Sequence, residues 1–465
     1  MNLGETVGSS FYPTRRTVEE RFDKSYLFLV ILVFRACLPW FQYRSKAIIV
    51  VPFFVLWYMF QIAKPYKIDI RRLMTLRSSF WLFVIIMILY RILPLVYGGW
   101  SSDGRDWRIM FTKGALTNLT MNVAFVFIVY FSILREKYKE LRFLGIVVLL
   151  SVLYVGIMSW CHGDEVAGGA SRFVLTAATN QLKEGGRIGE AAESALVVGK
   201  YGLGGYEIVY MTAFAIPGIL FSALKIKSHR MRVLCIVAGA AGVGTVLKGG
   251  LQTPVMVMLV GLLFFFLGIM FKLRRALIYL GVICMLLIGI FVVRPESFAF
   301  LAPALRAASE LTEQDFYKGR LVSLAEAVEG DKLTYSYSRY RLQAKSWEGF
   351  CEHPIFGGGT KARMGEHSEL LDTMSIYGLV GLSLMIAVLV SYFKFNCALA
   401  MGMRERQWLP LVYGYTGLYI FTSITNPVNI LSPLIILLFP ALALSYPGAP
   451  LDGSVCKEGE KPCLR

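Results

Sequence analysis

The residues best suited to chemistry lie in one polar segment that leads into a long apolar run. In this segment His367 and Ser368 come just before Glu369 and Asp372. We expect the histidine and serine to stand where a helix begins and both carboxylates to lie in its first turn, because the positive end of a helix favours negative charge. Histidine titrates near neutral pH and can take a proton from a hydroxyl, so His367 is our candidate general base.

Two glycines follow His367 at helical spacing. On a continuous helix Gly378, eleven residues later, lies close to the face that carries His367, and Gly381 lies one turn further along. A stripe of small residues lets a second helix pack closely. Close packing is the structural interpretation of these glycines, and support of a catalytic histidine is the functional one.

The remaining histidines and the cysteines give weaker signals. His229 lies in the basic sequence KSHR and reads as structural, while His162 and His353 stand at the edges of expected loops. There is no CxxC pair, so neither a zinc site nor a disulfide scaffold is indicated, and we predict no metal and no cofactor. In an oxidising compartment, Cys161 and Cys351 could form a disulfide or remain two free thiols.

The elements that position these residues must be membrane-spanning helices. Of the 465 residues 56% are hydrophobic, and the mean hydropathy of +0.58 is high. The apolar residues form runs of the length that crosses a bilayer. We predict an all-α, polytopic membrane protein whose residues 1–465 form a single integral membrane domain with about 12 transmembrane helices, without a removable signal peptide. The expected spans are 25–43, 47–63, 79–99, 116–134, 141–160, 206–224, 232–248, 251–271, 276–293, 370–394, 408–427 and 429–446.

Membrane topology explains the positive charge better than a nucleic-acid partner does. The formal charge of +17 comes from Lys and Arg between apolar runs, which gives no basic face for nucleic acid. Every second loop is rich in these residues, as cytoplasmic loops are. We therefore expect both termini in the cytoplasm and two long loops outside, 161–205 and 294–369, carrying short helices. The basic loop residues include Lys64, Lys67, Arg71, Arg72, Arg77, Arg135, Lys137, Lys139, Arg142, Lys225, Lys227, Arg230, Arg232, Lys272, Arg274, Arg275, Lys394, Arg404 and Arg406.

The expected spans contain few ionisable groups. Only Arg35 and Arg91 lie well inside a span, and no Asp or Glu lies in the middle of one. Coupled transporters generally need such a carboxylate or an unwound polar helix. A flippase for lipid-linked glycans or a solute transporter is therefore an alternative that the sequence disfavours.

The polar segment that contains His367 resembles a known protein family. His367, Ser368, nine residues, Gly378, two residues and Gly381 fit the pattern of the O-antigen polymerase and O-antigen ligase superfamily. An Arg-containing segment and HPIFGGG (353–359) precede it, as a similar element does in that family. The resemblance covers the span count, the long second loop and this motif. It departs where the family has a Ser-Arg pair, since this chain has Lys248 and Gln252 there.

The resemblance implies a membrane glycosyltransferase at the outer face of the bacterial inner membrane. Its donor would be an undecaprenyl-diphosphate-linked oligosaccharide, and His367 would be the base in an inverting displacement. Glu369 or Asp372 would orient the imidazole, and the amides of Gly357–Gly359 would approach a phosphate. The candidate cations for the diphosphate are Arg339, Arg341 and Arg363 near the motif, and Arg172, Lys183 and Arg187 in the first long loop.

Two activities remain open within this resemblance. A polymerase joins lipid-linked repeats to a growing chain, and a ligase moves a finished chain to lipid A-core. The missing Ser-Arg pair and the length of the chain favour the polymerase. The implied partners are the lipid-linked donor, the lipid bilayer and a polysaccharide chain-length regulator, with no nucleic acid.

Overall fold

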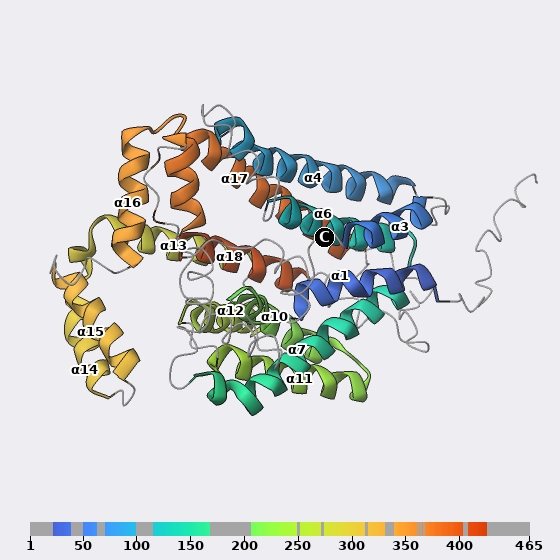
Figure 1. The fold of residues 1–465 in the computed structure, drawn as a ribbon, viewed down its shortest axis with the longest axis horizontal. Coiled ribbons are helices and arrows are strands. Elements are labelled where there is room, and N and C mark those ends of the chain that lie inside the picture. The colour runs from blue at the N-terminus through green and yellow to red at the C-terminus, as the bar shows by residue number, and fades with distance from the viewer. Residues whose placement is uncertain are drawn as a thin grey trace, which may run out of the picture.

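The protein is described here from a computed structural model. It describes residues 22–38, 50–62, 70–98, 115–167, 206–248, 252–270, 274–311, 315–330, 339–359, 362, 365, 368–402 and 408–425. All regular secondary structure in these ranges is helical, with no strand, which confirms the predicted all-α class. Most of the long helices run roughly along the longest axis of the molecule (Figure 1).

Each of the first eleven expected spans overlaps a helix in the described residues. The long elements are α1 (Leu27–Cys37), α3 (Val50–Ile62), α4 (Ile70–Gly98), α6 (Ala115–Leu134), α7 (Tyr138–Ala167), α10 (Tyr206–Lys225), α11 (His229–Lys248), α12 (Gln252–Met270), α13 (Arg274–Val293), α17 (Glu369–Gly402) and α18 (Leu409–Thr425). The largest differences in bounds are in α4, which begins nine residues before its expected span, and in α17, which ends eight residues after it. The expected span 429–446 lies outside the described residues.

Several helices have the length and composition of membrane spans. The four that suffice by both criteria are Tyr138–His162, Ile208–Lys225, His229–Lys248 and Glu369–Ala400. Shorter apolar helices occur in α3, α4, α6, α12 and α13. Large apolar side chains such as Met59, Ile85 and Leu286 are exposed on these helices, as lipid-facing residues are in a bilayer. These helices indicate a membrane protein.

Glycines bring pairs of helices into close contact. A Cβ atom added to Gly156 on α7 would overlap the backbone of Ala241 on α11, and one added to Gly281 on α13 would overlap that of Gly417 on α18. Such small residues let backbones approach closely where the surrounding lipid provides no hydrophobic force between helices. They fix the α7–α11 and α13–α18 pairs.

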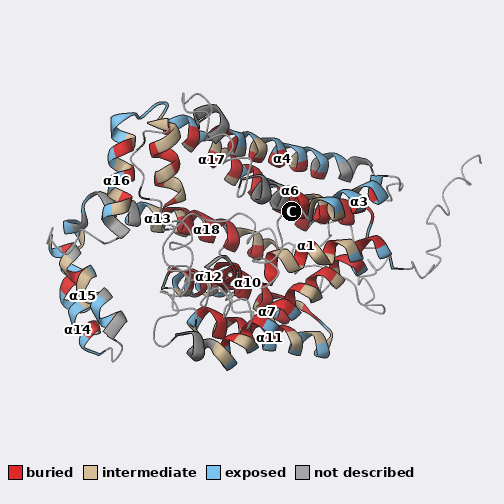
Figure 2. Cartoon of the chain, viewed as in Figure 1, coloured by how far each residue is buried: buried red, intermediate tan, exposed pale blue. Residues whose placement is uncertain are grey.

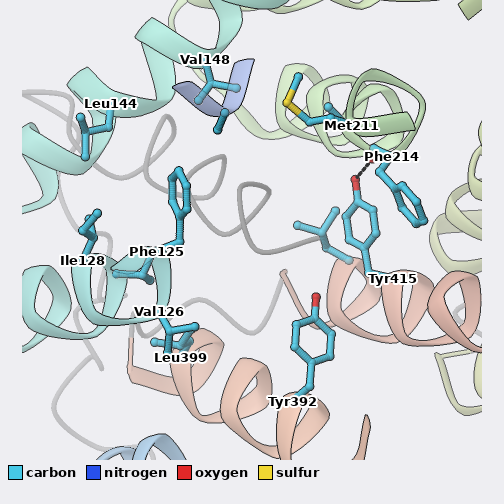
Figure 3. Close-up of a cluster of buried hydrophobic side chains, with 14 of the residues drawn as sticks. Phe125, Val126, Ile128, Leu144, Val148, Met211, Phe214, Tyr392, Leu399 and Tyr415 are labelled. Carbon is cyan, nitrogen blue, oxygen red and sulfur yellow. Dashed lines mark hydrogen bonds between the residues drawn. The ribbon is translucent and has the colours of Figure 1, made fainter. Parts of the chain in front are cut away.

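A tyrosine completes the core where a proline interrupts α10. Pro217 lies inside this helix. The Tyr415 hydroxyl of α18 donates to the carbonyl oxygen of Phe214 at 2.6 Å and accepts from the amide of Gly218 at 2.9 Å. A regular helix would join those two backbone groups to each other. Figure 3 shows Tyr415 reaching from α18 to Phe214 within the buried cluster.

The ends of four helices meet in a buried polar network. Arg135, in the turn between α6 and α7, is only 1% exposed, although the sequence pattern counts it among the cytoplasmic loop charges. Its Nη1 donates to Gln61 Oε1 at 2.7 Å, and Gln61 Nε2 donates to Asp23 Oδ2 at 3.1 Å. The Asp23 amide donates to Glu140 Oε1 at 2.9 Å. The network ties the starts of α1 and α7 to the ends of α3 and α6. We call this the network end.

The segment between α13 and α17 contains short helices, which confirms that part of the prediction for residues 294–369. They are the 3-10 helix η3 (Pro295–Leu301), α14 (Ala302–Glu310), α15 (Asp315–Glu329) and α16 (Arg339–Glu352). α14 and α15 extend away from the main body and carry many exposed residues (Figure 2). An ion pair between Arg306 and Glu329 joins them, and its hydrogen bond lowers the pKa of Glu329.

Candidate functional site

The motif residues lie at the end of the bundle crossed by α16. In Figure 1, α16 stands across the long axes of α4 and α18. The start of α17 and the end of α18 meet there, as Ser368 and Ser423 show: the Ser368 hydroxyl donates to the Ser423 carbonyl oxygen at 3.3 Å. We call this region the motif end.

Ser368 is the N-cap of α17. Its hydroxyl accepts from the amide of Leu371 at 3.2 Å, and its own amide donates to Asp372 Oδ2 at 3.2 Å. These bonds satisfy backbone donors that the first turn of a helix leaves unpaired. The helix begins at Glu369, with Glu369 and Asp372 in its first turn, so the predicted helix start is confirmed.

A serine on α16 holds the residues on both sides of His367. The Ser346 hydroxyl donates to Asp372 Oδ1 at 2.6 Å and accepts from the amide of Gly365 at 2.8 Å. Asp372 in turn holds the amide of Ser368. Ser346 is fully buried, and a Cβ added to Gly365 would overlap the backbone of Leu342. Gly365 and Ser368 are therefore fixed by one Ser346–Asp372 pair.

Two further contacts anchor this region to the bundle. Gln343 Nε2 on α16 donates to the carbonyl oxygen of Ile424 on α18 at 2.8 Å. The Tyr90 hydroxyl, near the end of α4, lies 3.1 Å from Thr373 Oγ1 and 3.5 Å from Glu369 Oε1. α16, α17, α18 and α4 thus share hydrogen bonds at the motif end.

α17 is broken at Gly378. This residue has φ 62° and ψ −151° inside the helix, a backbone conformation that essentially only glycine adopts. The expectation that Gly378 and Gly381 continue one straight face below His367 is therefore wrong, because that count assumes a continuous helix. Gly378 marks a change of backbone direction, and Gly381 lies in the second half of α17.

The segment 354–359, which we call the plug loop, supplies hydrogen bonds at the break. The amide of Leu379 donates to the Pro354 carbonyl oxygen at 2.8 Å, and the amide of Gly358 donates to the Ser375 carbonyl oxygen at 2.9 Å. In a continuous helix the Leu379 amide would donate to Ser375. The plug loop therefore binds both the donor and the acceptor that a continuous helix would join to each other.

Glycine is required on both sides of this contact. Gly357 has φ 73°, and a Cβ on it would overlap the backbone of Ile376 and Tyr377. A Cβ on Gly378 would overlap the backbone of Ile355 and Gly357. The amide of Gly357 donates to the His353 carbonyl oxygen at 2.9 Å. The amides of Gly357 and Gly358 are thus occupied within the protein, so the expectation that they approach a phosphate is wrong for these two.

The structure brings together only part of the predicted site. Ser368, Glu369 and Asp372 lie together at the start of α17, and Gly378 lies further along the same helix, at the break. Arg341 lies exposed on α16, and Arg339 is its first residue, with a side chain that is not described. Outside the described residues lie His367, Arg363, Arg172, Lys183 and Arg187.

Several residues of the motif end had no signal in the sequence. Ser346, Gln343 and Tyr90 are ordinary residues on helices, and only their hydrogen bonds to α17 or α18 identify them. Among the described residues no group of three or more His, Cys, Asp or Glu could hold a metal ion. Cys161 and Cys351 are exposed free thiols, so the disulfide alternative is not the one present.

In comparisons with known proteins, no family model matches the chain and no curated protein matches it. The site's own residues therefore carry the argument about function.

Proposed function

We propose that this protein is a membrane glycosyltransferase that polymerises a surface polysaccharide from undecaprenyl-diphosphate-linked repeats. The main supporting observation is that hydrogen bonds join both elements of the sequence motif, the plug loop and the residues that flank His367, to α17. The plug loop fills the break in α17, and the Ser346–Asp372 pair fixes the residues that flank His367. A base that must meet a hydroxyl in one geometry gains from such support, because catalysis depends on orientation.

We further propose about twelve spans, with both termini in the cytoplasm of a bacterial cell and the motif end on the outer face of the inner membrane. The grouping of helix ends supports this arrangement. Asp23, Gln61 and Arg135 meet at the network end, beside the basic loops that are expected to be cytoplasmic. Tyr90 and Glu369 meet at the motif end. Each helix in these contacts runs in the direction that alternating spans require.

The proposed reaction balances without an added cofactor. His367 takes the proton of an acceptor hydroxyl while that oxygen attacks the anomeric carbon of the donor. The bond between this carbon and the diphosphate oxygen breaks, and the leaving group is undecaprenyl diphosphate. Its negative charge would be stabilised by arginine, whose planar fork pairs with phosphate oxygens. The proposed cations are Arg339, Arg341, Arg363, Arg172 and Arg187.

Asp372 is better suited to fixing the backbone than to holding the imidazole. Each of its oxygens already accepts a hydrogen bond, one from Ser346 and one from Ser368. Glu369 is half-buried beside Tyr90 and is the better candidate for orienting His367.

The break in α17 also supports a second candidate, a flippase or transporter. Transporters use broken helices because the free ends of the half-helices bind ions and substrates. Here the amides of Leu379 and Val380 donate to the plug loop, and the Ser375 carbonyl oxygen accepts from it. Since these groups are already paired, the break is better suited to a structural joint than to a transport site.

Surface glycan display tests the proposal and its alternatives. A strain that lacks the native gene receives either the wild-type chain or His367→Ala, and its glycans are resolved by length. Single-repeat glycan on the final acceptor supports a polymerase. Long chains that never reach lipid A-core indicate a ligase. Loss of all outer-face lipid-linked glycan indicates a flippase.

The matched control is His229→Ala. His229 is exposed at the first residue of α11, and we expect this variant to display glycan as the wild type does. Normal display by His367→Ala would refute the catalytic assignment.

A further inference from the structure

The plug loop presents two apolar side chains at the motif end. Ile355 is 58% exposed and Phe356 is 67% exposed, although the plug loop is joined to the break in α17. Their backbone is held by the hydrogen bonds from Leu379 to Pro354 and from Val380 to Ile355.

An apolar stripe on α17 continues from these residues. Leu379, Ile386 and Val390 are exposed, and with exposed Ser383 they lie within a sector of about 60° on the second half of the helix. From Leu379 to Val390 the stripe runs about 16 Å along the helix axis. Because α17 is a candidate membrane span, a molecule immersed in lipid could follow the stripe to the plug loop.

Polar groups lie at the other side of the break. Ser368, Glu369 and Asp372 belong to the first half of α17, whereas the stripe belongs to the second half. The plug loop connects the two through hydrogen bonds to Ser375 and Leu379. A ligand that suits this arrangement has a polar head and a long apolar chain.

We propose that Ile355, Phe356 and the α17 stripe of Leu379, Ile386 and Val390 bind the polyprenyl chain of the lipid-linked donor. This inference rests on the proposed function and adds where the lipid part of the substrate lies. The chain stays in the hydrocarbon layer along α17, and the plug loop holds its last units so that the diphosphate meets the polar motif. Van der Waals contacts with these side chains supply the affinity, because lipid provides no hydrophobic force.

A comparison of donors with different chains tests the inference. Purified protein in vesicles receives the same oligosaccharide diphosphate on a full-length polyprenyl chain or on a short, water-soluble prenyl chain. A double variant, Ile386→Ser with Val390→Ser, should raise KM for the full-length donor at least tenfold more than KM for the short donor, since only the full-length chain reaches these two exposed residues. Phe356→Ser should raise KM for both donors, because both carry the prenyl units that the plug loop holds.

Phe300→Ser is the matched control. Phe300 is 73% exposed on η3, outside the plug loop, and its replacement removes a similar apolar surface. It should leave the ratio of the two KM values as in the wild type. Turnover of the short donor reports whether each variant is folded.

The outcomes separate the two proposals. Wild-type protein that uses neither donor would overturn the proposed function and this inference with it. Active wild-type protein whose KM ratio is unchanged in the Ile386→Ser, Val390→Ser double variant would overturn the inference alone. As a second measurement, a photo-crosslinking residue at Ile386 should trap the polyprenyl lipid. Trapping a second copy of the chain or another protein there would contradict the assignment.

Discussion

The Ser346 hydroxyl lies 2.6 Å from Asp372 Oδ1 and joins α16 to the first turn of α17. Since the same hydroxyl accepts from Gly365, Ser346→Ala removes two hydrogen bonds and leaves the buried amide of Gly365 without this partner. We expect a loss of about 1–3 kcal/mol of stability. If the pair positions His367, turnover should fall more than tenfold while KM changes little.

Kinetics of the double variant distinguish positioning from simple loss of stability. Ser346→Ala and Asp372→Ala should be strongly non-additive, because each removes the same contact. Ser391→Ala is the control. Ser391 is buried on α17, as a serine of the same helix as Asp372, and donates to the nearby Val388 carbonyl oxygen. Equal effects on turnover at Ser391 and Ser346 would contradict a positioning role.

Gly378→Ala should disrupt the joint between α17 and the plug loop. Alanine at φ 62° and ψ −151° is strained by about 1–3 kcal/mol, and its methyl group would overlap the backbone of Ile355. We expect a lower midpoint of thermal unfolding and little activity. In the control Gly319→Ala, nothing lies within 4 Å of the added Cβ, so the helix propensity of alanine should make this change neutral or stabilising. Normal activity in Gly378→Ala would mean that the break is not needed.

The helices could be predicted from the sequence, and the break could not. In a bilayer every backbone group must be paired within the protein, so an apolar run such as 206–224 has few choices besides a helix. It matches α10 within a residue or so. Gly378 gives no local signal of its conformation, because its strained backbone exists only where the plug loop, about twenty residues earlier, satisfies the helix ends.

Polar contacts between residues close in sequence could also be predicted, and those between distant residues could not. His367, Ser368 and Asp372 are close in sequence, so the capping of α17 could be read from their spacing. Ser346 could not be identified, because its role depends on α16 lying across the start of α17. Arg135 carries the sequence signal of a cytoplasmic loop charge, yet it is buried and donates to Gln61 at the end of α3. For Ser346 and Arg135, contacts with helices distant in sequence determine what the residue does.

Tyr415→Phe should destabilise the core without touching the motif end. Its hydroxyl bridges the carbonyl oxygen of Phe214 and the amide of Gly218, and phenylalanine would leave both buried groups without that partner. We expect a loss of about 1–3 kcal/mol, seen as a lower unfolding midpoint in detergent. Tyr413→Phe, on the same helix and half-buried against Phe393, should have a smaller effect. An equal shift in both variants would show that the bridge adds nothing.

Thiol labelling tests the proposed topology, on which the outer-face chemistry depends. Cys161 and Cys351 are exposed and free, and the topology puts both on the outer face. In chains that keep only one of them, with the other cysteines replaced, a membrane-impermeant maleimide should label the thiol in intact cells without a reductant. The inner-face control is Lys227→Cys in a chain without other cysteines, because Lys227 is exposed next to the start of α11. It should react only after the membrane is permeabilised. Labelling of Lys227→Cys alone in intact cells would invert the topology, place the motif end in the cytoplasm and exclude polymerisation at the outer face.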